Sequence, residues 1–428
     1  MVESLSVSYK PLWKSLIDRG LNKKELRELT ELSACTMAKL SKGQNVTTTV
    51  LLRICNALDC DLSDVVELTS TKPTRTKKRE PGRMHSPEVV SLFSGAGGLD
   101  LGFEKAGFKT IWANDFDADA QRVYKLNIGE IDPRDIREVP ISDIPGCDVL
   151  IAGFPCQPFS SAGKRKGVLD SRGMLYQECL RIIEDKMPQA VLFENVRGLL
   201  STKYIDGRKL VDVIKSDLES MNNVGYRVTY QLVNASDYGV PQNRYRLLMI
   251  GVRGDLGITF NFPEKIRDKS KLTIGNVIAN LPENVSNQVS WDLSPQAMQM
   301  VEHIPEGGSW KSVPYQLLAP RFRRIRDNMV KYRSPNFYRR FSRDEICGTI
   351  TASAQPENCG IVHPTENRRY TIREIARIQT FPDNFQFIDD TLKDIVAMYK
   401  VIGNAVPVKL AEVIGSAIMQ QVFCPASD

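Results

Sequence analysis

The stretch VVSLFSGAGGLDLGF, residues 89–103, decides the fold of most of this chain. An apolar run ends at Phe93, and a turn that contains Gly95 and Gly97 leads into a helical pattern. Glycines in such a turn let a ligand approach the backbone and the helix N-terminus closely. Asp100 stands where a GxGxxG motif would have its third glycine, which counts against a dinucleotide pyrophosphate site.

An acidic residue follows the next predicted strand. Asp115 lies 20 residues after Gly95, where an acid binds a ribose hydroxyl in nucleotide-binding sheets. A glycine turn used only for packing is the alternative. The turn and the carboxylate together predict a nucleoside-binding site without a strong phosphate cradle, and S-adenosylmethionine fits that description.

Apolar runs and amphipathic stretches alternate after this turn, which predicts an α/β fold with a parallel sheet. The predicted strands are residues 89–93, 110–113, 148–152, 190–194, 227–233 and 246–251, and the predicted helices are 99–106, 118–126, 174–185 and 210–221. This regularity is lost from about residue 255 to 365. Helices are predicted again at 371–379, where Thr371 and Glu374 form a capping box, and at 408–422.

The first 70 residues have a different pattern, typical of short helices. Asn22 followed by Glu25 predicts a helix start, Ser33 caps a helix over 34–40, and another helix covers about 50–58. Residues 71–87 are polar, basic and proline-bearing, and are predicted to be a linker.

Composition sets the class of protein. Hydrophobic residues make up 42% and charged residues 25%, no apolar run approaches the ~20 residues of a membrane span, and no signal peptide is recognisable. A cytoplasmic location is therefore expected. The nine cysteines are scattered without a CxxC pair, so neither a metal site nor a disulfide framework is expected.

Positive charge is concentrated in two places. Residues 72–83 carry six basic residues and one acid, and residues 321–343 carry nine basic residues, one acid and interleaved aromatic rings. A solvated surface is the plain interpretation. Two such clusters, one mixed with aromatics, favour nucleic acid as the partner.

Four residues with reactive or charged side chains lie at or near the ends of predicted strands. Cys156 lies in the loop GFPCQPFS, residues 153–160, between two prolines, and Glu194 lies in FENV, residues 193–196. Arg244 and Arg246 alternate in VPQNRYRLLMIG, residues 240–251, so they share one face of an extended strand. Ligands of open α/β sheets bind at the carboxyl ends of strands, which makes Cys156 and Glu194 candidates for one site.

With IGNAVPV at residues 402–408, these stretches in this order resemble the DNA (cytosine-5)-methyltransferase family over about residues 89–422. The resemblance implies a Rossmann-like S-adenosylmethionine-dependent methyltransferase domain at 88–265 and 366–428. A smaller irregular target-recognition region would occupy 266–365. It implies that Cys156 is the nucleophile, that Glu194 hydrogen-bonds the N3 edge of a flipped cytosine, and that Arg246 contacts the cytosine beside its companion Arg244. No metal is required.

The resemblance also implies the residues that hold the two substrates. The cofactor contacts are Phe93, Gly95, Gly97, Asp115, Phe116, Asp135, Ile136, Pro155 and Asn404. The family commonly has Glu where this chain has Asp115, so the ribose contact has a shorter reach. The DNA contacts are Gln157, Ser160, Lys164, Arg165 and Arg172 in a loop that closes over DNA, with Arg323 and Arg339 in the target-recognition region.

Residues 21–68 resemble the Cro/repressor type of helix-turn-helix domain, which implies an N-terminal all-α DNA-binding domain over residues 1–70. The helix predicted over residues 34–40 would be the second helix of the motif. It would enter the major groove and present Thr36 and Lys39. The whole chain is therefore identified as a site-specific methyltransferase of a restriction–modification system whose added domain regulates transcription, and a dimer through that domain stays open. The alternatives are a repressor with vestigial methyltransferase activity and an RNA cytosine-5 methyltransferase.

Overall fold

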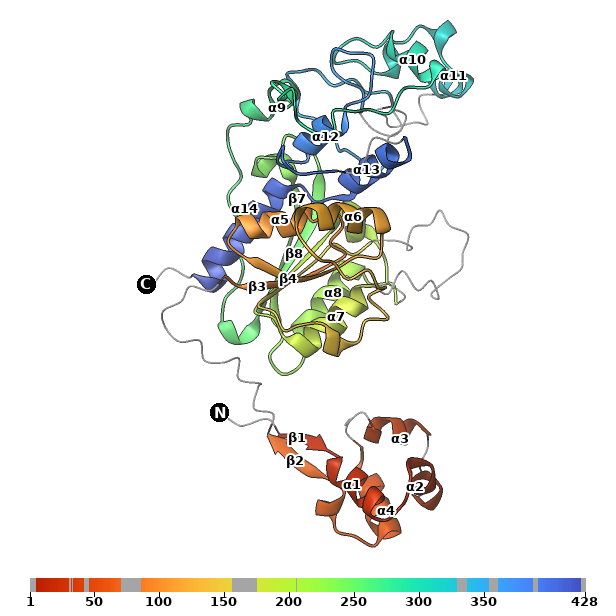
Figure 1. Ribbon diagram of the computed structural model, residues 1–428, viewed down its shortest axis with the longest axis vertical. Helices are drawn as coiled ribbons and strands as arrows, with labels where there is room; N and C mark the ends of the chain where they lie inside the picture. Colours follow the sequence, from red (N-terminus) through yellow and green to blue (C-terminus); the bar gives the residue numbers. More distant parts are fainter. Residues whose placement is uncertain are drawn as a thin grey trace. The chain divides into compact units, whose positions relative to one another are not determined.

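The computed structural model divides the chain into two compact units, residues 1–84 and 85–428. Both are drawn in Figure 1. The predicted catalytic and target-recognition stretches fall within the second unit. The structure describes residues 5–30, 32, 34–41, 46–70, 86–155, 175–204, 206–328, 337–353, 361–387 and 392–424.

The first unit is a small helical domain with a short sheet. Its helices are α1 (Lys10–Asp18), α2 (Lys23–Thr30), α3 (Ala34–Ser41) and α4 (Thr48–Leu58), followed by the 3-10 turn η1 (Leu62–Asp64). Its core contains Leu12, Leu26, Leu40, Ile54 and Leu58, all buried. The predicted start of α2 is present, because the Asn22 side chain accepts a hydrogen bond from the Glu25 backbone at 3.1 Å.

The prediction of helices alone missed two strands in this unit. Strand β1 (Leu5–Ser8) pairs antiparallel with β2 (Glu67–Ser70). Each strand has only four residues, which is too short for an alternation of apolar and polar side chains to be recognised in the sequence. Pairing between the two segments stabilises the extended conformation of each. The pairing closes the unit, since it joins its first and last described segments.

The second unit is built on a six-stranded sheet in the order β4-β3-β5-β6-β8-β7. Its strands are β3 (Glu88–Leu92), β4 (Lys109–Asn114), β5 (Val149–Ala152), β6 (Ala190–Val196), β7 (Tyr226–Asn234) and β8 (Tyr245–Arg253). All six were predicted. The expected parallel pairing is wrong for β8, which runs antiparallel to both β6 and β7. Residues 235–244 between β7 and β8 are too few for the crossover that a parallel pair requires.

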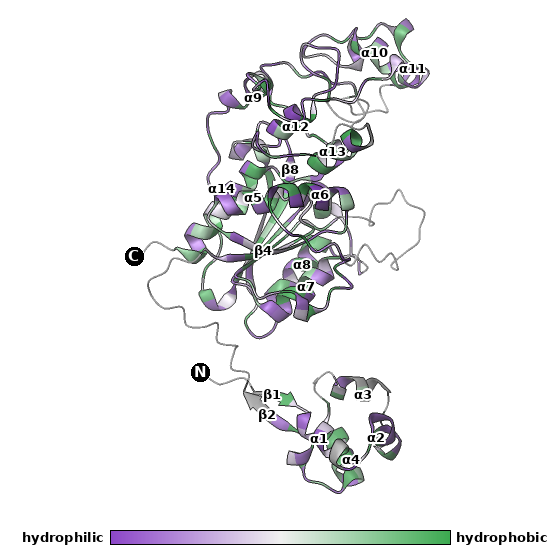
Figure 2. Cartoon of the chain, in the orientation of Figure 1, coloured by the Kyte–Doolittle hydropathy of each residue, from purple (hydrophilic) through white to green (hydrophobic). Residues whose placement is uncertain are grey.

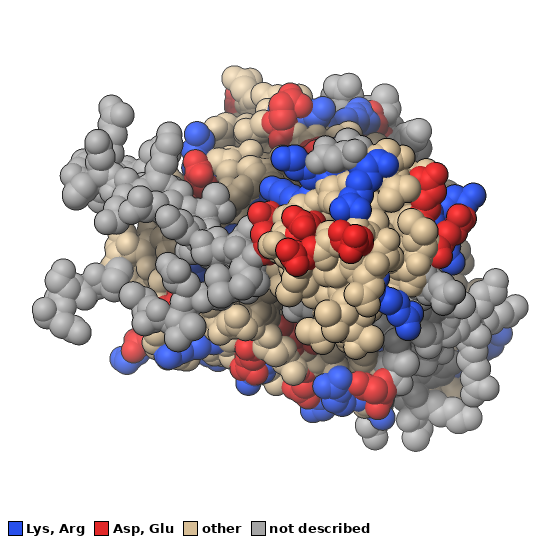
Figure 3. Space-filling model, turned by 90° about the horizontal axis from the view of Figure 1, so that it is seen from below, with Lys and Arg blue, Asp and Glu red and all other residues tan. Residues whose placement is uncertain are grey.

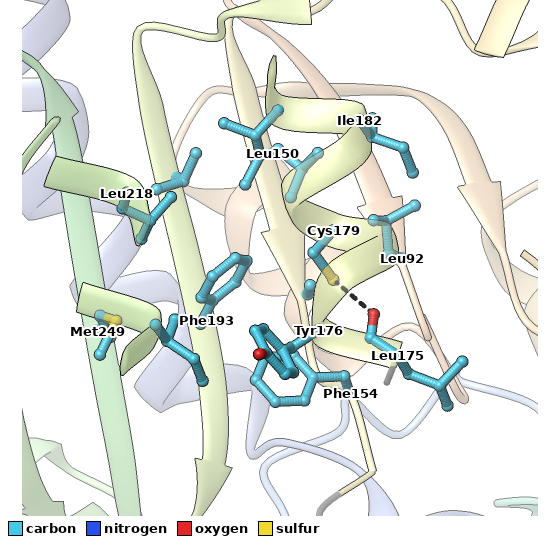
Figure 4. Packing of buried hydrophobic residues seen from close by; sticks show 14 of the residues in the cluster. Leu92, Leu150, Phe154, Leu175, Tyr176, Cys179, Ile182, Phe193, Leu218 and Met249 are labelled. Atoms are coloured by element: carbon cyan, nitrogen blue, oxygen red, sulfur yellow. Dashed lines mark hydrogen bonds between the residues drawn. The ribbon is translucent and has the colours of Figure 1, made fainter. Parts of the chain in front are cut away.

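Helices cover both faces of this sheet. Cys179, Ile182 and Ile214 of α7 (Leu175–Lys186) and α8 (Leu210–Glu219) pack with Leu150 and Phe193 on one face, as Figure 4 shows for α7. On the other face, α5 (Gly98–Lys105) and α14 (Val408–Ile418) pack on the alternate side chains of the same strands. The central strands are therefore apolar on both faces (Figure 2).

The last helix of the unit packs closely on the first. A Cβ added to Gly102 of α5 would lie 2.3 Å from the Cβ of Ala411 and 2.7 Å from the carbonyl oxygen of Val408, both in α14. A Cβ added to Gly98 would lie 2.2 Å from the carbonyl oxygen of Val406. Only glycine allows these two helices to approach so closely.

Residues beyond β8 form a smaller helical part and return to the sheet. Its helices are α9 (Ile274–Ile278), α10 (Pro295–Val301), α11 (Pro320–Asp327), α12 (Ile372–Ile378) and α13 (Leu392–Asn404). Earlier in the chain, α6 (Ala118–Asn127) packs against β4. Trp310, Phe322 and Tyr338 belong to a separate hydrophobic cluster around α10 and α11. The predicted capping box of Thr371 and Glu374 is present.

The predicted final helix is α14 with a π-helical turn, η11 (Met419–Phe423). By length and composition, residues 394–423 would be able to cross a membrane, but 72% of their most apolar window is buried inside the fold. Burial of this extent is what a core helix shows.

Candidate active site

A cavity of about 330 Å³ opens at the carboxyl ends of β3, β4, β5 and β6. The start of β8 and the loop between α13 and α14 complete its wall. Of the predicted site residues, the structure brings together Phe93, Gly95, Asp115, Phe116, Pro155, Glu194, Arg244, Arg246 and Asn404 on this wall. Cys156 lies outside the described residues, directly after Pro155.

The glycine turn and Asp115 form one corner of the cavity. Gly95 has φ +58°, and a Cβ built on it would meet nothing within 4 Å, so its backbone faces open space. Its N–H donates to Asp115 Oδ2 at 2.8 Å, and the Asp117 N–H donates to Oδ1 at 2.8 Å. Burial raises the pKa of Asp115, while these two N–H groups and the charge of Lys400 oppose that shift. The carboxylate is therefore held in one orientation.

Phe116 follows Asp115 and is 66% exposed. This exposed aromatic ring on a cavity wall offers a flat apolar surface for a heterocycle. The corner therefore supplies a hydrogen-bond acceptor and a stacking surface side by side, which is what a nucleoside needs.

Three predicted cofactor residues are not among those that line the cavity. Gly97 has φ +80°, and a Cβ there would lie 2.0 Å from Ile128 Cδ1, so this glycine serves the turn and its packing. Asp135 forms an ion pair with Arg137, and Ile136 is buried in the hydrophobic cluster on the face of the sheet that α7 and α8 cover. Their contact with a cofactor stays a prediction.

Glu194 and Arg246 form an ion pair across two antiparallel strands. Val196 at the end of β6 pairs with Arg246 at the start of β8, which puts Glu194 within reach. Arg246 Nε lies 2.7 Å from Glu194 Oε1, and each side chain is 11% exposed. Charge-assisted pairs of this kind fix the orientation of a carboxylate. Both residues line the cavity, so the pair can offer a carboxylate and a guanidinium to a polar group bound there.

Asn195, which the sequence patterns did not single out, anchors the loop that leads to Cys156. It is 4% exposed, and its Nδ2 donates to the Phe154 carbonyl oxygen at 3.0 Å. A Cβ on Gly153 would lie 3.6 Å from Glu194 Oε2. The start of the GFPC loop thus runs directly past the Glu194 carboxylate.

Arg244 takes a different position from Arg246. It is 1% exposed and donates to the carbonyl oxygens of Ile350 at 2.7 Å, Gly403 at 2.9 Å and Ala405 at 3.1 Å. Burial, with a smaller effect of the nearby Arg246 charge, lowers its pKa to about 9. These bonds make Arg244 a positioning residue for the cavity wall, whatever further contact it makes with a substrate.

Two buried glutamines, Gln242 and Gln379, complete a polar node beside Arg244. Gln242 Nε2 donates to Gln379 Oε1 at 3.0 Å, and Gln242 Oε1 accepts from the Ile350 N–H at 2.9 Å. Gln379 Nε2 donates to the Ile402 carbonyl oxygen at 2.8 Å. The only signal in the sequence was a glutamine in line with the apolar face of α12. The node joins the segment before β8, the end of α12, the segment at Ile350 and the loop that holds Asn404.

The predicted DNA-contacting residues fall into three groups. Gln157, Ser160, Lys164, Arg165 and Arg172 lie outside the described residues. On α3, Lys39 is exposed and Thr36 is half-buried. Arg323 and Arg339 are engaged inside the protein, the first with the Leu318 carbonyl oxygen at 2.8 Å and the second with Glu345 at 2.6 Å.

The neighbours of Arg323 on α11 are differently placed. Arg321 and Arg324 lie one turn apart and are exposed, and Arg321 stacks over the Phe337 ring at 5.6 Å. They are therefore better placed than Arg323 to meet a partner. On the face in Figure 3, the described basic and acidic residues are interspersed. Among the described residues, no group of three metal-ligating side chains occurs.

Comparisons with known proteins agree with these features. A family model described as C-5 cytosine-specific DNA methylase matches residues 88–420, and one described as Cro/C1-type HTH DNA-binding domain matches residues 11–70. Type II methyltransferase M.NgoFVII of Neisseria gonorrhoeae is 39% identical over 333 residues, covering 76% of this chain and 84% of the relative. M.NgoPII of the same organism is 36% identical over 351 residues, covering 79% and 97%. The methyltransferase EhMeth of Entamoeba histolytica shares the fold, with a TM-score of 0.52, 18% identity and coverage of 78% and 98%.

Proposed function

This chain belongs to the C-5 cytosine-specific DNA methylase family, and we propose that it transfers a methyl group from S-adenosylmethionine to C5 of a cytosine in duplex DNA. One observation carries the proposal. The Glu194–Arg246 pair, suited to a base, and the Asp115–Gly95 corner, suited to a nucleoside, lie on the wall of one cavity.

The residues of the corner fit the methyl donor. Asp115 would accept hydrogen bonds from the ribose hydroxyls, and Phe116 would lie against the adenine. The open backbone at Gly95 and the exposed Asn404 would border the amino-acid end. When bound there, the donor supplies an electrophilic methyl group on a sulfonium. Asp115 is already fixed by two N–H groups, so little reorganisation is needed.

Cys156 is the proposed nucleophile. Cytosine C5 is too weak a nucleophile to take a methyl group directly. Addition of the Cys156 thiolate to C6 makes C5 enamine-like, so that C5 attacks the methyl carbon and the carbon–sulfur bond of the donor breaks. A base then removes the C5 proton, and the thiolate leaves C6 as the ring double bond re-forms. Pro155, on the cavity wall, and Asn195, bonded to Phe154, would set the direction from which the thiol approaches.

Glu194 and Arg246 would stabilise the activated ring. Addition at C6 pushes negative charge toward N3, where a proton held between N3 and the Glu194 carboxyl group stabilises it. Arg246 keeps that carboxylate in place and adds a cation beside the developing charge. The cytosine would have to leave the duplex to reach this pair, so base flipping is part of the proposal. The target sequence would be read by residues 266–365.

A second function is proposed for the first unit. The match to a Cro/C1-type DNA-binding domain over residues 11–70 favours transcriptional regulation at an operator, with α3 in the major groove. The relatives are named Type II methyltransferases, and we propose that this chain likewise protects DNA in a restriction–modification system and regulates that system's genes.

Bisulfite sequencing of DNA from cells that express the chain tests the proposal. We expect 5-methylcytosine at one recurring sequence, its loss in Cys156→Ala and Glu194→Gln, and its persistence in Cys424→Ala, which changes an exposed cysteine far along the chain. Deletion of residues 1–70 should abolish operator binding and leave methylation. Absence of methylation from the wild type, or full activity of Cys156→Ala, would overturn the proposed chemistry.

A further inference from the structure

An ion pair on the cavity wall belongs to none of the roles described above. The ammonium of Lys400, on α13, pairs with Asp117 Oδ2 in the turn between β4 and α6. Both residues line the same cavity as Asp115. Their side chains are 45% and 29% exposed, so solvent reaches the pair without separating it.

Asp117 is in direct contact with the proposed ribose-binding acid. Its N–H donates to Asp115 Oδ1 at 2.8 Å. Its side chain also caps α6, accepting from the backbone N–H groups of Asp119 at 3.1 Å and Ala120 at 3.3 Å. Hydrogen bonding to Asp117 raises the pKa of Lys400, and the charges of Asp119 and Asp115 act in the same direction. The Lys400 cation therefore interacts electrostatically with the corner of the cavity that Gly95 and Asp115 form.

The methyl donor and its product differ by one charge. The donor has a sulfonium and the product has a neutral thioether, while the adenosine and amino-acid groups are the same in both. A fixed charge beside the cavity therefore changes the affinity for the donor relative to that for the product. A neutral group that only shapes the cavity changes both affinities alike. Lys400 repels the sulfonium, and Asp117 attracts it.

We propose that the Asp117–Lys400 pair sets the preference of the cavity for the methyl donor over its demethylated product. The inference rests on the proposed function, because it takes S-adenosylmethionine as the donor. The carboxylates of Asp115 and Asp117 would attract the sulfonium and so favour the donor over the product. The Lys400 cation, paired with Asp117, offsets that attraction.

Two variants with opposite expected signs test this assignment. Lys400→Met keeps the apolar stem and removes the cation, so the ratio of product Kd to donor Kd should rise. Asp117→Asn removes the anion and keeps an equally good helix cap, so the same ratio should fall. A unit charge acting over about 10 Å changes such a ratio by about twofold in water and by about fifteenfold at the effective dielectric constant of about 20 near a protein surface. The change should shrink at 1 M salt, where the Debye length is about 3 Å.

Isothermal titration of S-adenosylmethionine and S-adenosylhomocysteine into the full chain measures both dissociation constants. The matched control is Arg122→Met. Arg122 Nη1 lies 3.4 Å from Asp394 Oδ1 and so also links α6 to α13, but neither residue lines the cavity. The control should leave the ratio unchanged.

Ratios that move in the same direction in both variants, or that do not move, would overturn the inference. An equal loss of affinity for both compounds in Lys400→Met would also overturn it, because it would mean that Lys400 binds a group they share. A wild-type chain that bound neither compound would refute the proposed function itself. If Lys400→Met fails to fold, the Asp117→Asn variant alone tests the inference, through the expected fall in the ratio of product Kd to donor Kd.

Discussion

Replacing Gln379 by leucine tests the polar node beneath the cavity wall. The side chain is fully buried and uses both ends of its amide. Its oxygen accepts from Gln242 Nε2 at 3.0 Å, and its nitrogen donates to the Ile402 carbonyl oxygen at 2.8 Å. Leucine has a similar volume, so the change removes hydrogen bonds without opening a large cavity.

The expected destabilisation follows from the groups left without partners. Gln242 Nε2 would stay buried without this partner, at a cost of about 1–3 kcal/mol. The Ile402 carbonyl oxygen would lose one hydrogen bond, worth about 0.5–1.5 kcal/mol, and would keep the Ala405 N–H at 3.2 Å. The additional apolar surface of leucine offsets about 1–2 kcal/mol of that sum. We therefore expect the free energy of unfolding of the second unit to fall by about 1–2 kcal/mol. The loop at Asn404 should also loosen, which weakens donor binding.

Urea unfolding followed by tryptophan fluorescence measures this change. Three of the four tryptophans, Trp112, Trp291 and Trp310, lie in the second unit, so a Trp13→Phe background makes the signal specific to it. Wild type and Gln379→Leu are compared in that background, and donor affinity is measured by isothermal titration. A Gln379→Leu variant as stable as the wild type would refute the reasoning.

A double-mutant cycle with Gln242→Leu separates the shared hydrogen bond from other effects. The double variant leaves fewer buried groups unpaired than the two single variants do together. Its destabilisation should therefore be smaller than the sum of the singles by about 1–3 kcal/mol. Simple additivity would show that the two glutamines do not form one node.

Three further predictions concern other sites. Burial raises the pKa of Asp100 to about 7 from an ordinary value of 3.8, so the folded state holds its proton more tightly than the unfolded state. Stability should fall as pH rises from about 4 to about 7 and level off above, and Asp100→Asn should flatten this slope in urea midpoints measured from pH 4 to 8. Arg324→Gln should lower the slope of log Kd against log salt for duplex DNA by about one, measured by fluorescence anisotropy, whereas Arg323→Gln should change thermal stability and leave the slope alone. Gly403→Ala would place a Cβ 2.2 Å from the Thr351 carbonyl oxygen, and donor affinity measured by titration should fall by at least about tenfold.

The strands of the sheet were predictable from the sequence because buried strands appear there as short runs of apolar residues. Residues 149–152 are buried at every position, and no polar alternation obscures the run. Strand direction is not encoded in such a run, so the reversal of β8 emerged only from the pairing. The pairing of β1 with β2 was hidden for a similar reason, since it joins segments about sixty residues apart.

The site was predictable where motifs mark strand ends and unpredictable where it depends on long-range contacts. Asp115 and Glu194 follow apolar runs, and both line the cavity. Gln242 and Gln379 are 137 residues apart and meet only in the folded chain. Arg323 and Arg339 belong to the basic cluster of the predicted target-recognition region, and a charge pattern does not reveal that the Leu318 carbonyl oxygen and Glu345 already bind them.

The close packing of α5 on α14 has a consequence for synthesis on the ribosome. The first helix of the second unit cannot find its final partner until residues 408–418 have emerged, whereas β2 completes the first unit by Ser70. At about 5–20 residues per second, the two events are separated by about 20–70 seconds. Each nascent chain therefore completes its Cro/C1-type domain well before the cavity of the second unit can form.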